Sequence, residues 1–72
     1  MNTEELKQAI ADAESIAKTG TREEKEDLAT WAGFSIAYYS SQYNEEARAN
    51  LKTVNTIYTA YLKALSEANK GE

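Results

Sequence analysis

Apolar positions recur with helical spacing in three segments of the chain. In residues 3–18 the apolar side chains form one stripe about 120° wide. This stripe consists of Leu6, Ala9, Ile10, Ala13, Ile16 and Ala17. Residues 22–42 and 45–69 show the same periodicity, and no segment alternates as a strand would. We therefore expect an all-α fold, a three-helix antiparallel bundle with helices over residues 3–18, 22–42 and 45–69.

Local signals support these boundaries. Asn2 or Thr3 can cap the first helix, and Gly20 can end it in the left-handed conformation. Thr21 and Glu24 have the spacing of a capping box, which opens the second helix. Ser41 or Asn44 can cap the third helix, although the second and third helices could also continue as one. Gly71 marks the expected end of the third helix.

The second helix belongs to an unusual stretch, because residues 28–44 contain no charged residue. Its apolar spacing predicts one broad face, with Phe34 and Ile36 on the edges, and Trp31 and Tyr39 are expected in the core. That face consists of Leu28, Trp31, Ala32, Ser35, Tyr38 and Tyr39. The remaining face holds small residues, including Gly33, which costs about 1 kcal/mol relative to alanine inside a helix. We therefore expect another helix to pack closely against Gly33.

The third helix carries a heptad seam over three repeats. The seam consists of Ala47, Leu51, Val54, Tyr58, Tyr61, Leu65 and Ala68. Ile57, Ala60 and Ala64 form a second stripe beside it, which we expect to be shallower. The seam residues Leu51, Val54, Tyr58 and Leu65 are expected to be buried.

Composition limits the chemistry available to the chain. With 72 residues, no Cys and no His, we expect a single domain over residues 1–72 without disulfides or thiolate metal sites. The absence of His also removes the usual general base at neutral pH. The acids Glu23, Glu24, Glu26 and Asp27 are interpreted as a solvated first helical turn, and Ser40 and Ser41 have no His to activate them. We therefore expect no enzyme activity, no catalytic or metal residue and no cofactor.

The charge is unevenly distributed. The net charge is −4, and the whole negative excess lies in residues 1–27. A nucleic-acid-binding protein would need a clustered basic surface, so nucleic acid is not expected as a partner. Residues 28–44 are too few and too polar to span a bilayer, and the N-terminus shows no secretory signal pattern. We expect a cytoplasmic protein without membrane contact.

The aromatic residues predict a contact surface. Seven large rings exceed what one small core can hold, and five of them are tyrosines, whose hydroxyls require partners. Residues 53–62 form a second uncharged run, which would lie beside residues 28–44 in a hairpin. Together the two runs would form a Tyr-rich, low-charge face larger than a monomer usually exposes. The expected interface comprises Phe34, Tyr38, Ser41, Tyr43, Thr53 and Tyr61.

These observations favour a non-enzymatic protein–protein interaction module, such as a small accessory or inhibitor protein, that binds a protein partner or forms a homodimer. Its length and composition are common among phage- and plasmid-encoded accessory proteins. One alternative is a small-molecule binder with an aromatic-lined pocket between helices. A second alternative is an acidic mimic of nucleic acid, for which a net charge of −4 is small.

Overall fold

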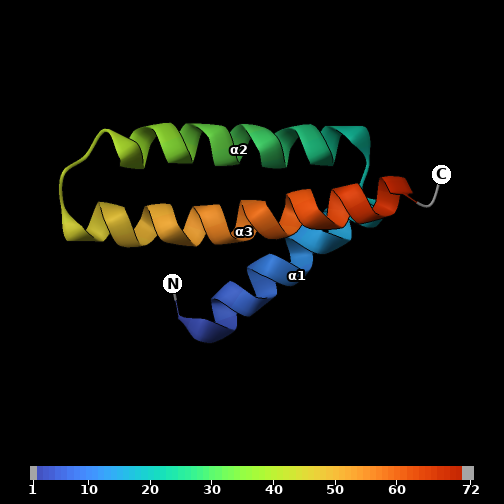
Figure 1. The fold of residues 1–72 in the computed structure, drawn as a ribbon, viewed down its shortest axis with the longest axis horizontal. Helices are drawn as coiled ribbons and strands as arrows, with labels where there is room; N and C mark the ends of the chain where they lie inside the picture. Colours follow the sequence, from blue (N-terminus) through green and yellow to red (C-terminus); the bar gives the residue numbers. More distant parts are fainter. Residues whose placement is uncertain (1, 71–72) are drawn as a thin grey trace.

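The computed structural model describes residues 2–70, which form three α-helices joined by two short turns. Helix α1 spans Thr3–Thr19, α2 spans Arg22–Ser40 and α3 spans Glu45–Lys70. Helices α2 and α3 lie side by side and antiparallel, whereas α1 crosses the C-terminal half of α3 obliquely (Figure 1). The described residues contain no strand, which confirms the expected all-α three-helix bundle. Gly71, the expected end of the third helix, lies outside the described residues.

The corner between α1 and α2 depends on Gly20. Its N–H donates to the carbonyl oxygen of Ile16 at 2.9 Å. The backbone of Gly20 is extended, with φ −72° and ψ 159°, so the expected left-handed conformation is wrong. Gly20 and the N-cap Thr21 are both extended, so the chain passes from α1 to α2 without a left-handed residue. A Cβ atom on Gly20 would lie only 2.6 Å from the Ile16 carbonyl oxygen, so a close approach explains the glycine.

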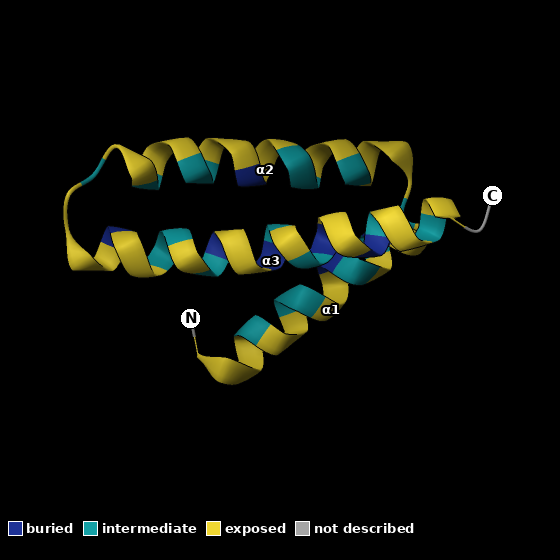
Figure 2. Cartoon of the chain, viewed as in Figure 1, coloured by how far each residue is buried: buried dark blue, intermediate teal, exposed yellow. Residues whose placement is uncertain are grey.

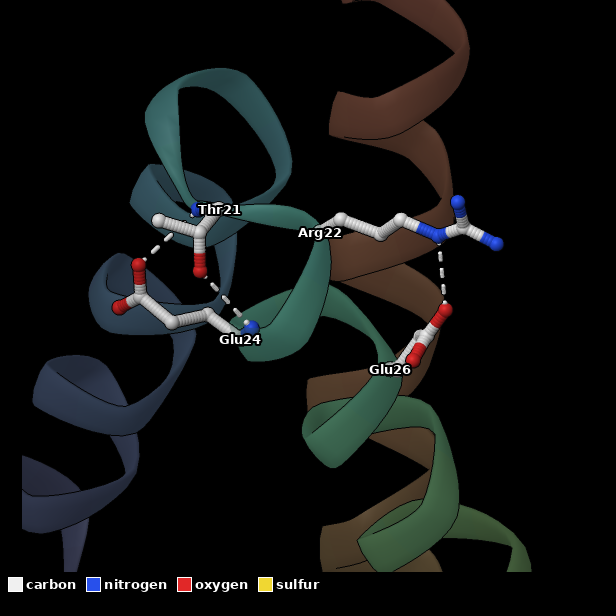
Figure 3. A network of polar contacts seen from close by, with 4 residues as sticks. All are labelled: Thr21, Arg22, Glu24 and Glu26. Carbon is white, nitrogen blue, oxygen red and sulfur yellow. Dashed lines mark hydrogen bonds and ion pairs between the residues drawn. The ribbon is translucent and has the colours of Figure 1, made fainter.

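The start of α2 is held by the expected capping box (Figure 3). The N–H of Glu24 donates to Thr21 Oγ1 at 3.1 Å, and the N–H of Thr21 donates to Glu24 Oε1 at 2.9 Å. Beside it, Arg22 Nε donates to Glu26 Oε1 at 3.0 Å, in an exposed pair one helical turn apart. The capping box satisfies the backbone N–H groups of Thr21 and Glu24, which have no acceptor within the helix, and it thereby localises the beginning of α2.

A turn of four residues, 41–44, separates α2 from α3, so the second and third helices are distinct. The N–H of Ser41 contacts the carbonyl oxygens of Ala37 and Tyr38 at 3.2 and 3.3 Å, which closes the last turn of α2. Asn44 caps α3, because its Oδ1 accepts from the N–H of Ala47 at 2.7 Å. Asn2 caps α1 in the same way, through the N–H of Glu5 at 2.8 Å.

The core lies on two sides of α3, because α3 packs against both other helices while α1 and α2 touch little. Towards α1, Ile57, Tyr61 and Ala64 form one buried cluster with Ala13 and Ala17. The expected α1 stripe is confirmed, since its remaining members pack against this cluster. The expected shallower stripe of α3 is in fact deeply buried at Ile57 and Ala64. A helix that packs against two neighbours uses both of its apolar stripes.

The seam of α3 is buried less completely than expected. Val54 is buried, whereas Leu51, Tyr58 and Leu65 are half-buried. Five of the eight buried residues in the described chain are alanines, so the helices approach closely and enclose little side-chain volume. These five are Ala13, Ala17, Ala32, Ala47 and Ala64. The core is therefore small even for a chain of this length.

Helix α2 turns most of its predicted apolar face towards the core, but it is rotated towards Ile36 and away from Trp31. Ala32 is its one buried residue, and Leu28, Ser35, Ile36 and Tyr39 are half-buried. Trp31, expected in the core, is 40% exposed, and Tyr38, expected at the interface, is 60% exposed. The broad apolar pattern of α2 allowed several rotations about its axis, and packing against α3 selected the one centred on Ala32.

Candidate protein-interaction surface

The outward face of α2 is the candidate site. Figure 2 shows that the edge of α2 turned away from α3 is exposed along its whole length. Phe34 is 74% exposed on this face, and Tyr38 is 60% exposed beside it. We define the α2 face by its exposed uncharged members: Thr30, Gly33, Phe34, Ala37, Tyr38 and Ser41. These residues recur at intervals of three and four, so they share one side of the helix.

A shallow groove lies in the middle of the α2 face. It is lined by Thr30, Gly33, Phe34 and Ala37. No described atom beyond the helix itself and the chain neighbours lies within 4 Å of a Cβ built on Gly33. The expected close packing of another helix against Gly33 is therefore wrong within this chain, because α2 turns its Ala32 side towards α3. The missing side chain of Gly33 instead opens a hollow next to the projecting ring of Phe34.

Three aromatic residues mark the C-terminal end of the α2 face. The rings of Tyr38 and Tyr39 meet edge to face, with centroids 5.4 Å apart and planes at 69°. The hydroxyl of Ser41 donates to the carbonyl oxygen of Tyr38 at 2.7 Å, which orders the end of the helix. Tyr43 follows in the turn and is 95% exposed. Phe34, Tyr38, Ser41 and Tyr43, all predicted interface residues, thus lie exposed along one helix and the turn after it.

The remaining two predicted interface residues lie elsewhere. Tyr61 is only 4% exposed and belongs to the cluster between α1 and α3, so a partner cannot reach its ring. Burial raises the pKa of the Tyr61 hydroxyl above its ordinary value, and the neighbouring Tyr58 adds to this effect. Thr53 is half-buried one turn before Ile57, and its hydroxyl donates to the carbonyl oxygen of Ala49 at 3.1 Å. Neither residue belongs to the α2 face.

The predicted joint face of the second and third helices is therefore a face of α2 alone. The uncharged run of α3 turns Val54, Ile57 and Tyr61 into the core. Its outward side is mostly polar and lines a second shallow groove, formed by Leu51, Lys52, Asn55, Thr56 and Thr59. The only large apolar side chain that α3 exposes among the described residues is Leu62, at 45%.

Thr30, Gly33 and Ala37 belong to the surface although they were not predicted as interface residues. Their signal in the sequence was the face of small residues on the second helix, which was interpreted as the contact site of another helix. The structure shows that no described part of the chain covers this face.

Acidic side chains flank the α2 face at its N-terminal end. Glu23, Glu26 and Asp27 are exposed, and Glu26 pairs with Arg22. Within residues 2–70, no group of three or more acidic, His or Cys side chains is close enough together to hold a metal ion. No helix in that range has the length and apolar character needed to cross a bilayer.

In comparisons with known proteins, no family model, no curated protein and no solved structure matches the chain.

Proposed function

We propose that the chain is a non-enzymatic protein-interaction module that binds through the α2 face. The observation that carries this proposal is that small side chains fill the core while large aromatic side chains lie at the surface. Alanines make up most of the core, while Phe34, Tyr38 and Tyr43 are 74%, 60% and 95% exposed. Placing large rings in water forgoes about 1.5–3 kcal/mol of burial for each ring, which a partner can recover.

The chemistry of the face supports protein as the partner. Aromatic side chains interspersed with small polar ones provide rigid anchors and adaptable hydrogen bonds, the combination that recognition surfaces use. Phe34 and Tyr38 would be the central anchors. The acids Glu23, Glu26 and Asp27 lie at one end of the face, where charge influences association rate and partner choice more than affinity.

Small-molecule binding has weaker support. A site for a small molecule encloses most of its ligand, whereas the grooves on α2 and α3 are shallow and open to solvent. The tyrosines that would line an enclosed pocket under this alternative are divided between the core, where Tyr61 lies, and the surface, where Tyr38 and Tyr43 lie.

Site-specific photo-crosslinking in the host cell tests the proposal. A benzophenone amino acid replaces Phe34 in one variant and Thr59, exposed on the outward side of α3, in the control. We expect discrete protein adducts from position 34 that are absent from position 59. These adducts should disappear when Tyr38→Glu is added, because it places an unpaired charge in the contact.

Adducts of equal pattern and yield from both positions would contradict a role for the α2 face. A folding defect is excluded by comparing the melting curves of the variants, since Phe34, Tyr38 and Thr59 are all exposed.

A further inference from the structure

We infer that the α2 face binds a second copy of this chain, an inference that rests on the proposed function. The two α2 helices lie antiparallel about a two-fold axis near Phe34.

The first argument is that one face carries both a projection and the hollow that fits it. Phe34 projects with 74% of its side chain exposed. The groove beside it is lined by Thr30, Gly33 and Ala37, and the space over Gly33 is open. In a two-fold interface residue i contacts residue j and j contacts i. The ring of Phe34 from each copy can therefore enter the groove of the other, and one motif satisfies both sides.

The second argument is the placement of charge. Each copy has a net charge of −4, so two copies repel each other unless the contact avoids the acids. The centre of the α2 face is uncharged, whereas Glu23, Glu26 and Asp27 occupy its N-terminal end. A parallel pair would set these acids side by side. An antiparallel pair separates the two Asp27 residues by roughly 20 Å along the axis, since each residue rises about 1.5 Å, which is well beyond the screening length of about 8 Å.

The antiparallel arrangement also places the turn after α2 of one copy near the acids of the other copy. The acids of one copy would lie near Ser41 and Tyr43 of the other. Tyr43 is 95% exposed, so its hydroxyl is free to reach a carboxylate. A hydrogen bond from a phenol to a carboxylate is charge-assisted and stronger than one between neutral groups.

The available area sets the strength of the contact. An aromatic side chain offers about 150–250 Å². Phe34 and Tyr38 are 74% and 60% exposed, and Trp31, one turn before Phe34 and outside the defined α2 face, is 40% exposed. Together the three side chains offer roughly 350 Å² on each copy. Even with the small residues of the groove, the total stays below about 1,200 Å², the range of weak and transient interfaces. The expected dimer is therefore reversible and depends on concentration.

Sedimentation equilibrium combined with amide NMR spectra, recorded from about 10 µM to about 1 mM, tests this inference. The average mass should rise from 8.0 kDa towards twice that value. The concentration-dependent shifts should concentrate in residues 30–43. Ala37→Glu places two charges near the axis and should raise the dissociation constant at least about thirtyfold. Thr59→Glu adds the same charge on α3, away from the α2 face, and should leave the constant nearly unchanged.

A spin label decides the orientation. The chain has no cysteine, so Ser40→Cys gives a single labelling site beside the α2 face. Labelled protein is mixed with unlabelled, isotope-enriched protein. The antiparallel pair predicts broadening of amide signals around residues 26–30 of the enriched copy, whereas a parallel pair would broaden those around residue 40.

Each outcome bears on the inference. A chain that stays monomeric at about 1 mM, a dimer that Ala37→Glu does not weaken, or broadening around residue 40 overturns it. The proposed function is judged separately by the crosslinking experiment. Adducts from position 34 with a different protein, together with a monomer in solution, would overturn the second copy as the occupant and uphold the α2 face as a binding surface.

Discussion

The rings of Tyr58 and Tyr61 stack on each other, with centroids 5.9 Å apart and planes inclined by only 12°. The two residues lie one helical turn apart on α3. Tyr61 is buried against α1, while Tyr58 is half-buried at the edge of the same cluster. The stacked pair thus covers one side of the core with aromatic surface, and it brings two phenol groups close together.

This arrangement predicts a loss of stability at high pH. Burial, with a smaller effect of Tyr58, raises the pKa of the Tyr61 hydroxyl in the folded chain. In the unfolded chain the pKa of a tyrosine is about 10. Below about pH 10, Tyr61 is protonated in both states, and its contribution to the free energy of unfolding is constant. Above that pH, the unfolded chain loses the Tyr61 proton before the folded chain does. The free energy of unfolding therefore falls as pH rises.

Denaturant unfolding at a series of pH values from neutral to alkaline measures this effect. Tyr61→Phe should remove much of the decline, because the variant has no proton to lose at that position. Tyr43→Phe is the control, since Tyr43 is 95% exposed and should leave the decline unchanged. Equal pH profiles for the parent and Tyr61→Phe would contradict the prediction.

The core between α1 and α3 should dominate stability. Ile57 is 3% exposed, and Ile57→Ala should lower the free energy of unfolding by about 2–5 kcal/mol, because it removes buried methyl groups and leaves a cavity. Leu62, five residues later on the same helix, is 45% exposed. Leu62→Ala should therefore change the free energy of unfolding by about 0.5 kcal/mol or less. Thermal unfolding followed by circular dichroism compares the two, and similar losses would show that α3 is rotated differently.

Gly20 should not tolerate even a methyl group. A Cβ atom there would lie 2.6 Å from the carbonyl oxygen of Ile16 and 2.9 Å from its Cα, both backbone atoms that cannot easily move aside. We expect Gly20→Ala to lower the free energy of unfolding by about 1–3 kcal/mol, as overpacking does. A melting temperature equal to that of the parent would mean that the corner between α1 and α2 relaxes freely.

Gly33 should behave in the opposite way. The space over Gly33 is open, and alanine is favoured over glycine in a helix by about 1 kcal/mol. Gly33→Ala should therefore raise the free energy of unfolding by about that amount, measured in dilute solution where the chain is monomeric. A variant less stable than the parent would indicate that another helix covers this position.

The extent of each helix could be predicted from the sequence, because it depends on interactions between residues close together in the chain. The pair Thr21 and Glu24 localised the start of α2 through hydrogen bonds three residues apart, and Asn44 did the same for α3. The α1 stripe also identified its buried face, because a narrow apolar stripe allows only one orientation. The exposure of Tyr43, and of at least one of Phe34 and Tyr38, followed from counting more rings than a small core can hold.

Only the tertiary structure decided how α2 and α3 are rotated about their axes. Apolar and small residues surround most of α2, so several orientations bury similar area, and the Ala32 side was selected by how closely α2 approaches α3. That choice placed Trp31 at the surface and left Gly33 open. Packing of α1 on the other side of α3 buried Tyr61 and removed it from the predicted interface. Such outcomes depend on contacts between residues distant in the chain, and the periodicity of a single helix does not contain them.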